Sequence, residues 1–249
     1  MDFDTHEFLK ALTSPEFLHG AITAIEAAFV AQAGAVVLGF IVALLRRSHL
    51  RGVRAAGWTY VWFFRALPTL LVLFMVYFAV PQLIPVLRNY LSSFVAAVVG
   101  LAIVEAAYMA EIIRAALLSV DEGQGLAARA LGMTPAKVMS KVVLPQAIRV
   151  AIPATGNEFI GMIKYTSLAS VIALSELLTK AGNQVSVTFR YAEYYSAAAM
   201  YYLVIVSVVM FFQSRLERRY RWLSKGIAAD PDGARTVGSA LAGRVGAGA

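Results

Sequence analysis

The sequence predicts an all-α integral membrane protein with about five membrane-spanning helices. Of its 249 residues, 59% are hydrophobic and 15% are charged, whereas a soluble domain carries about a quarter charged residues. Its mean hydropathy is +0.69. Apolar runs near the ~20 residues that cross a bilayer recur along the chain. They are Ala21–Leu45, Trp58–Phe78, Leu91–Leu118, Ile152–Leu178 and Tyr195–Phe212.

The segment before the first run (1–19) is predicted to be extracytoplasmic. Its apolar residues, among them Phe8 and Phe17, favour a short interfacial helix. Asp2, Asp4 and Glu7 are unlike the basic start of a cleavable signal peptide. We therefore expect the membrane domain to cover 20–225.

Basic residues are concentrated in alternate loops and predict the orientation. They flank the first loop at Arg46 and Arg54, the third at Arg129 and Lys141, and follow the last run. The positive-inside rule then places the N-terminus outside and the C-terminus in the cytoplasm. The residues after the last run (226–249) are rich in Gly and Ala without apolar periodicity, which predicts a disordered cytoplasmic tail.

The third loop, about 121–149, is unusually long and polar for a membrane protein. The stretch Gly123–Arg149 predicts two short helices joined by a turn at Gly132. Thr134 suits an N-cap and Pro135 suits the first turn of the second helix. Pro145 is predicted to end that helix.

The spacing of this loop resembles the "EAA" loop of ABC importer permeases: Ala-Ala, three residues, Gly, nine residues, then Val-x-Leu-Pro. In that family the loop docks on a cytoplasmic ATPase. The resemblance implies coupling roles for one set of residues: Gly123, Gln124, Leu126, Ala127, Ala128, Arg129, Gly132, Leu144 and Pro145. Leu126 stands where the family has an acid, which removes one ion pair. The literal Glu105-Ala106-Ala107 lies in an apolar run, with Glu111 where the Gly is required, so it is not this loop.

The resemblance extends over roughly 20–223 and is specific. Phe64–Thr69 is similar to the "F-R-G-T-P" of polar amino acid permeases, with Ala66 and Leu67 as departures. Tyr108–Arg114 is similar to "Y-x-A-E-I-I-R", and Pro153–Leu168 to "P-x-x-x-N-E-F-I-x-x-x-K-x-T-S-L". The chain is identified as a histidine/glutamine/arginine/opine-type permease, a type I ABC importer transmembrane subunit.

Membership in that family implies the partners. They are two ATPase subunits, an extracytoplasmic solute-binding protein and a second permease chain, the same or a paralogue, in the bacterial cytoplasmic (inner) membrane. The subunit would not be an enzyme and would need no cofactor or metal. The net charge of +7 suits anionic membrane lipid and requires no nucleic acid.

Polar residues inside the apolar runs indicate a solute path, because charges at membrane depth normally face water or a partner. The predicted path residues are Asn157, Glu158, Lys164, Thr166 and Ser167. Glu158 would receive a substrate ammonium and Lys164 would be a structural partner. Polar packing between helices is the alternative for this segment.

Other polar residues have more ordinary interpretations. Glu111 and Arg114 are three apart and suit a helical ion pair, and Arg65 suits a reach to the cytoplasmic interface. An aromatic belt is predicted from Tyr191, Tyr194, Tyr195, Tyr201 and Tyr202.

The residues also bear on two other classes of function. An intramembrane hydrolase would need a nucleophile and base within the spans, and the three histidines all lie outside the runs or at their ends. A membrane channel or secondary transporter stays open from the residues alone, although no inverted repeat is visible.

Overall fold

The computed structural model describes residues 3–221, with side chains up to Arg219, and every regular element in that range is helical. The helices of the first half are α1 (Thr5–Thr13), α2 (Pro15–Arg46), α3 (Arg51–Ala66), α4 (Thr69–Phe74), α5 (Val80–Leu83) and α6 (Ser93–Leu118). Those of the second half are α7 (Glu122–Ala130), α8 (Pro135–Val138), α9 (Leu144–Tyr165), α10 (Leu177–Thr188) and α11 (Tyr191–Arg221). The predicted all-α membrane fold is confirmed.

Three helices are long and apolar enough to cross a membrane: α2, α6 and the stretch Tyr191–Arg219 of α11. Two bent pairs bring the number to as many as five, namely Arg51–Ala66 with Thr69–Leu83, and Pro135–Ile172 with Leu177–Thr188. These five segments correspond to the five predicted runs, with different boundaries.

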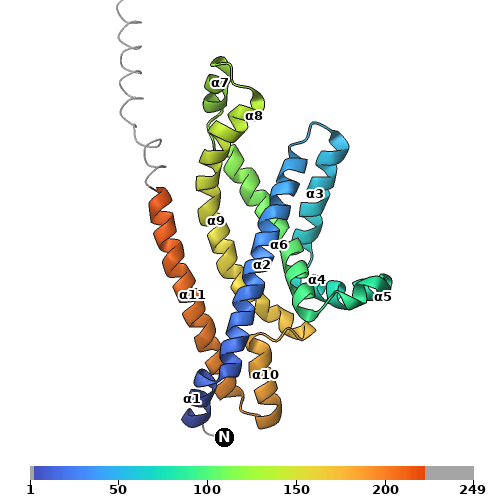
Figure 1. Cartoon of the computed structure of the whole chain (residues 1–249), viewed down its shortest axis with the longest axis vertical. Helices are drawn as coiled ribbons and strands as arrows, with labels where there is room; N and C mark the ends of the chain where they lie inside the picture. The colour runs from blue at the N-terminus through green and yellow to red at the C-terminus, as the bar shows by residue number, and fades with distance from the viewer. Residues whose placement is uncertain (1–2, 222–249) are drawn as a thin grey trace, which may run out of the picture. The chain divides into compact units, whose positions relative to one another are not determined.

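The predicted second span, Trp58–Phe78, is wrong as a single helix. α3 ends at Ala66, and the two helical parts differ in direction by 104°. Pro68 causes the break, because it disfavours α-helical geometry at the residue before it. Leu67 is accordingly extended, with ψ 139°. α4 and α5 therefore turn sideways from the end of α3 (Figure 1).

The prediction that Pro145 ends the loop's second helix is also wrong. A π-helical turn at Met139–Val143 joins α8 to α9, and the N–H of Leu144 bonds to the carbonyl of Met139, five residues back. This wider turn accommodates a proline whose missing N–H would interrupt a regular helix. The same device, a π turn at Met75–Ala79, precedes Pro81.

The core forms where α2 and α6 lie side by side (Figure 1). Alanines on both helices, including Ala27, Ala31 and Ala97, are fully buried. Gly39 permits the closest approach, since a Cβ there would lie 2.6 Å from Met109 Cβ. Small residues let helix backbones approach closely in membrane proteins.

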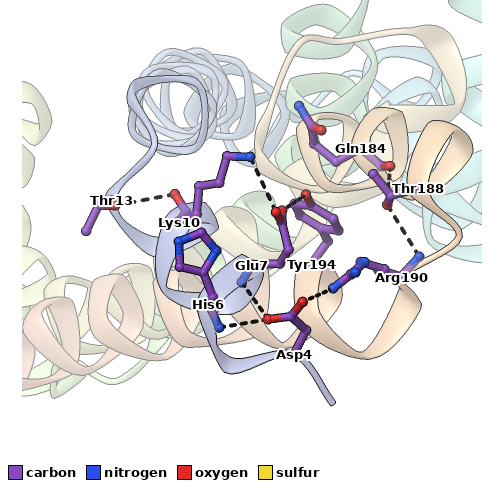
Figure 2. A network of polar contacts seen from close by, with 9 residues as sticks. All are labelled: Asp4, His6, Glu7, Lys10, Thr13, Gln184, Thr188, Arg190 and Tyr194. Carbon is purple, nitrogen blue, oxygen red and sulfur yellow. Dashed lines mark hydrogen bonds and ion pairs between the residues drawn. The ribbon is translucent and has the colours of Figure 1, made fainter. Parts of the chain in front are cut away.

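The N-terminal helix α1 is predicted as an interfacial helix, and it also packs against α11. Asp4 forms an ion pair with Arg190, and the hydroxyl of Tyr194 donates to Glu7 at 2.7 Å (Figure 2). Tyr201 donates to the carbonyl of Leu12 at 2.8 Å.

The predicted aromatic belt is therefore wrong for three of its five tyrosines. Tyr194 and Tyr201 hold α1, and Tyr202 donates to Glu176 at 2.8 Å. Only Tyr191 and Tyr195 are exposed, by 57% and 40%.

The chain divides into two compact units, Met1–Gln213 and Ser214–Ala249. All contacts discussed below lie in the first unit. In the second, Arg218 donates to the carbonyl of Ser214 at 3.2 Å within one helical turn. The predicted tail, 226–249, lies outside the described residues.

Candidate coupling loop and solute cavity

The predicted third loop folds as two short helices, as expected from its sequence. α7 begins at an N-cap, Asp121, whose carboxylate accepts from the N–H of Gly123 at 2.8 Å. α8 begins at the N-cap Thr134, which accepts from the N–H of Lys137 at 3.4 Å, with Pro135 in its first turn. Both caps satisfy N–H groups that a helix start leaves without partners.

Gly132 forms the turn between the two helices. Its φ of +79° lies in the left-handed region that glycine adopts without strain. Its N–H bonds to the carbonyl of Arg129 at 2.9 Å, and the N–H of Met133 bonds to that of Ala128 at 3.2 Å. This pair of bonds is the Schellman motif, which closes the C-terminus of α7.

Most of the predicted coupling residues lie on the open surface of this loop. The exposed ones are Gly123, Gln124, Leu126, Ala127, Arg129, Gly132 and Pro145. Ala128 is buried, and Leu144 is half-buried. Leu126 is 58% exposed, an apolar side chain on a polar helix. The loop lies at the opposite end of the first unit from α1 (Figure 1).

Leu144 has a structural role that its predicted coupling role did not include. It packs, with Met139 and Val143, against a buried cluster that includes Ala116 and Leu117 at the end of α6. Because α8, the π turn and α9 follow one another without a break, one helical stretch runs from Pro135 to Tyr165.

That helical stretch leads to a cavity of about 120 Å³ between α4, α6 and α9. Its polar wall is formed by Thr69 of α4, Glu105 and Tyr108 of α6, and Glu158 and Tyr165 of α9. Two carboxyl groups from helices far apart in sequence therefore face one small space. Leu101, Val104 and Met162 supply apolar wall.

Of the polar residues that line the cavity, only Glu158 is among the predicted path residues, and Glu105 is the carboxyl that the prediction lacks. It is only 3% exposed, and its Oε1 has no hydrogen-bond partner among the described residues. A buried carboxyl oxygen without a partner is costly unless a ligand or water satisfies it. The signal in the sequence is an acid inside the apolar run Leu91–Leu118, where a charge normally faces water or a partner.

The other predicted path residues do not line this cavity. Asn157 and Lys164 are exposed, and Lys164 forms no ion pair within residues 3–219. Thr166 is buried and donates to the carbonyl of Ile163 at 2.7 Å, while Ser167 donates to that of Lys164 at 2.7 Å. These two hydroxyls satisfy the backbone where α9 changes to a 3-10 turn, Thr166–Ile172.

The expected ion pair of Glu111 and Arg114 is confirmed, at 2.9 Å, and Arg46 of α2 occupies the other carboxylate oxygen. Arg65 lies with its guanidinium carbon 5.2 Å from the centre of the Tyr108 ring. Within residues 3–221, no group of three or more His, Asp or Glu side chains is placed to hold a metal ion.

A family model described as "binding-protein-dependent transport system inner membrane component" matches residues 35–222. The chain belongs to this family. It is therefore a multi-pass inner membrane permease, a transport component and not an enzyme. Membership also removes the alternatives of a membrane channel and a secondary transporter.

Curated relatives agree with this assignment along most of the permease. It is 40% identical to the probable amino-acid permease protein YxeN of Bacillus subtilis, over 77% of this chain and 85% of that one. It is 34% identical to the glutamine transport system permease protein GlnP of Escherichia coli, over 90% of this chain and 100% of that one.

Solved structures show the same architecture. The crystal structure of an amino acid ABC transporter with histidines matches the permease with a TM-score of 0.79 and 36% identity, over 88% of this chain and 100% of that one. The methionine ABC transporter MetNI, at 22% identity and a TM-score of 0.67 over 82% and 95% of the two chains, supports the fold alone.

Proposed function

We propose that this permease is the membrane subunit of an ATP-driven importer of polar amino acids, with a preference for solutes that carry a cationic group. The names of the relatives refer to amino acids, glutamine and arginine, which supports the solute class. Two cavity carboxyls, Glu105 and Glu158, support the cationic preference, because an ammonium or guanidinium would satisfy both.

The proposed partners are two ATPase subunits, an extracytoplasmic binding protein and a second permease chain. For the ATPase to reach the α7–α8 loop, that loop lies in the cytoplasm and α1 lies outside. Arg46, Arg129 and Lys141 near the cytoplasmic ends support this orientation. The ATPase would contact the exposed face of α7, where Leu126 would offer apolar surface in place of the family's acid.

One observation carries the coupling mechanism: an unbroken helical stretch joins the loop to the cavity wall. Movement of α8, when the ATPases close on ATP, would displace α9 and with it Glu158. The cavity would then change its access from one side of the membrane to the other. ATP favours one of these two access states and solute favours the other. Coupling is therefore a shift in the populations of the two states.

The test is solute uptake by the complete transporter, reconstituted with its binding protein. Glu158→Gln and Glu105→Gln should each raise the arginine concentration for half-maximal uptake about tenfold or more, since a charge-assisted hydrogen bond is worth ~1.5–3 kcal/mol. Glutamine uptake should change less.

Glu26→Gln is the matched control, because Glu26 is an exposed acid on α2 that does not line the cavity. Unchanged uptake and selectivity in both cavity variants, with normal assembly, would remove the cavity from the solute path.

A further inference from the structure

A second cavity, of about 360 Å³, lies beside α3 and is not part of the coupling loop. Arg46 of α2, Trp58, Trp62 and Arg65 of α3, and Glu111 of α6 form its wall. We call it the α3 groove. Its volume falls within the ~300–1,000 Å³ of small-molecule sites.

Positive charge exceeds negative charge at the α3 groove. The one carboxylate, Glu111, is already shared between Arg46 and Arg114. Arg65 has no carboxylate partner among the described residues and lies over the Tyr108 ring. Its planar guanidinium is therefore free to bind a phosphate through two parallel hydrogen bonds.

The aromatic wall is typical of a membrane interface. Trp58 and Trp62 are one helical turn apart, with ring planes within 2° of parallel, and each is 57% exposed. Indole rings favour the headgroup level of a bilayer. Arg51 and Arg54 precede them on the same face of α3, which contains no acidic residue.

Contacts between helices place the groove at the end of the first span. A Cβ on Gly57, the neighbour of Trp58, would lie 2.8 Å from Cγ of Arg46, the last residue of α2. Trp58 therefore lies near the level where the apolar part of α2 stops, and Trp62 and Arg65 lie about one and two helical turns further along α3, on the apolar side of that level. Phospholipid headgroups begin at that level too.

We propose that the α3 groove binds the phosphate-bearing headgroup of an anionic phospholipid, with Arg65 as the main phosphate ligand and the two tryptophans lining the groove between Arg65 and the end of α2. Basic pockets between spans on the cytoplasmic side are suited to such headgroups. The headgroup would belong to the inner leaflet if the orientation proposed above holds. The ability of the groove to bind a phosphate does not depend on that orientation.

The experiment measures quenching of Trp58 and Trp62 by brominated lipids. The complete transporter is reconstituted in phosphatidylcholine with increasing brominated phosphatidylglycerol or, separately, brominated phosphatidylcholine. The signal of the α3 groove is the difference from a Trp58→Phe/Trp62→Phe transporter, which removes the contribution of Trp222 and of the partner subunits.

We expect half-maximal quenching at a mole fraction of brominated phosphatidylglycerol about fivefold lower than that of brominated phosphatidylcholine, since one arginine contributes ~1 kcal/mol to anionic lipid binding. Arg65→Gln should abolish this preference. Arg65→Lys, which keeps the charge, should retain most of it. Arg51→Gln, which removes the same charge from the same helix face outside the groove, should leave it unchanged.

Four results would overturn the proposal. Equal quenching by the two lipids would show no selectivity for an anionic headgroup. If inorganic phosphate at constant ionic strength reduces the quenching by brominated phosphatidylglycerol, the site binds a free anion. If neither brominated lipid quenches Trp58 and Trp62, another protein chain covers the groove. An equal effect of Arg51→Gln and Arg65→Gln would indicate diffuse surface attraction.

Discussion

The side-chain amide of Gln213 donates a hydrogen bond of 2.7 Å to the backbone carbonyl of Pro153. This bond ties α11 to the middle of α9, at the one proline that lies inside that helix. Gly156, one turn further along, leaves the space that the Gln213 amide occupies, because a Cβ there would overlap it. The helix that carries Glu158 is thus held on the side of α11.

Gly156→Ala should therefore displace Gln213 and lower the free energy of unfolding of the transporter by ~1 kcal/mol, the contribution of one hydrogen bond. Gly182→Ala is the matched control. A Cβ on Gly182 would meet nothing within 4 Å, so the helix propensity of alanine should keep or raise stability. In a Gln213→Ala background the cost of Gly156→Ala should disappear, and an unchanged cost would refute the packing explanation.

Gly132 should tolerate only residues that adopt a left-handed backbone. No atom lies within 4 Å of a Cβ built there, so the cost of a side chain is conformational. Gly132→Val should cost ~1–2 kcal/mol in the turn and reduce solute-stimulated ATP hydrolysis, whereas Gly132→Asn should retain it. Equal activity of the two variants would show that the turn does not need this geometry.

Leu126 should contribute apolar contact to assembly with the ATPase. Burial of an exposed leucine contributes ~1.5–3 kcal/mol, so Leu126→Ala should weaken binding of the ATPase by about tenfold. Leu126→Met preserves apolar volume and should bind nearly as well. Affinity of the purified ATPase for the reconstituted permease is the measurement. If the alanine variant binds as tightly as the original, Leu126 lies outside the contact.

Acid should release α1 from Arg190 and from α11. The Arg190 guanidinium holds the pKa of the Asp4 carboxyl below its ordinary 3.8, and the Tyr194 hydroxyl holds the pKa of Glu7 below its ordinary 4.5. Because both pKa values are lower in the folded state, their stabilisation is complete above the ordinary values. It is lost as the pH falls through the lowered ones.

The chain has no cysteine, so a spin label at Leu9→Cys reports on α1 alone. Label mobility should rise between about pH 6 and about pH 3. In the double variant Asp4→Asn/Glu7→Gln, the spin label should be mobile already at the higher pH, and its mobility should change little with acid. A label that stays equally immobile at both values would contradict the role of these carboxylates.

Local signals in the sequence predicted the two helices and the turn of the coupling loop. Features that depend on tertiary contacts could not be predicted in this way. Gly132 and Thr134 act within one or two turns of their own position, so their roles followed from residue type. Pro68 and Pro145 are the same residue type with opposite outcomes, because a π turn precedes only the second. Whether such a turn forms depends on packing, here of Met139 and Val143 against the end of α6.

The cavity could be predicted only in part for the same reason. Glu158 was identified from polarity within one apolar run, and it does line the cavity. Glu105 and Thr69 line the same cavity from other helices. The periodicity of one segment cannot predict that residues of different helices lie close together. Tyr194 and Tyr201 are one heptad apart on a single helix face, which was a usable sign that they pack inward.

The central claim is that the helical stretch from α8 to α9 transmits ATPase movement to the cavity. Ser140 is exposed in the π turn, inside the helical stretch from Pro135 to Tyr165. Ser140→Pro should break the stretch, at a cost of about 3 kcal/mol to the helix, while the exposed face of α7 stays intact. Ser140→Ala is the control.

The decisive measurement is solute uptake per ATP hydrolysed, in vesicles that contain the complete transporter and its binding protein. With Ser140→Pro we expect the ATPase to bind and hydrolyse ATP at its basal rate, while uptake per ATP falls about tenfold or more below that of Ser140→Ala. Uptake per ATP equal in the two variants would contradict the proposed coupling path.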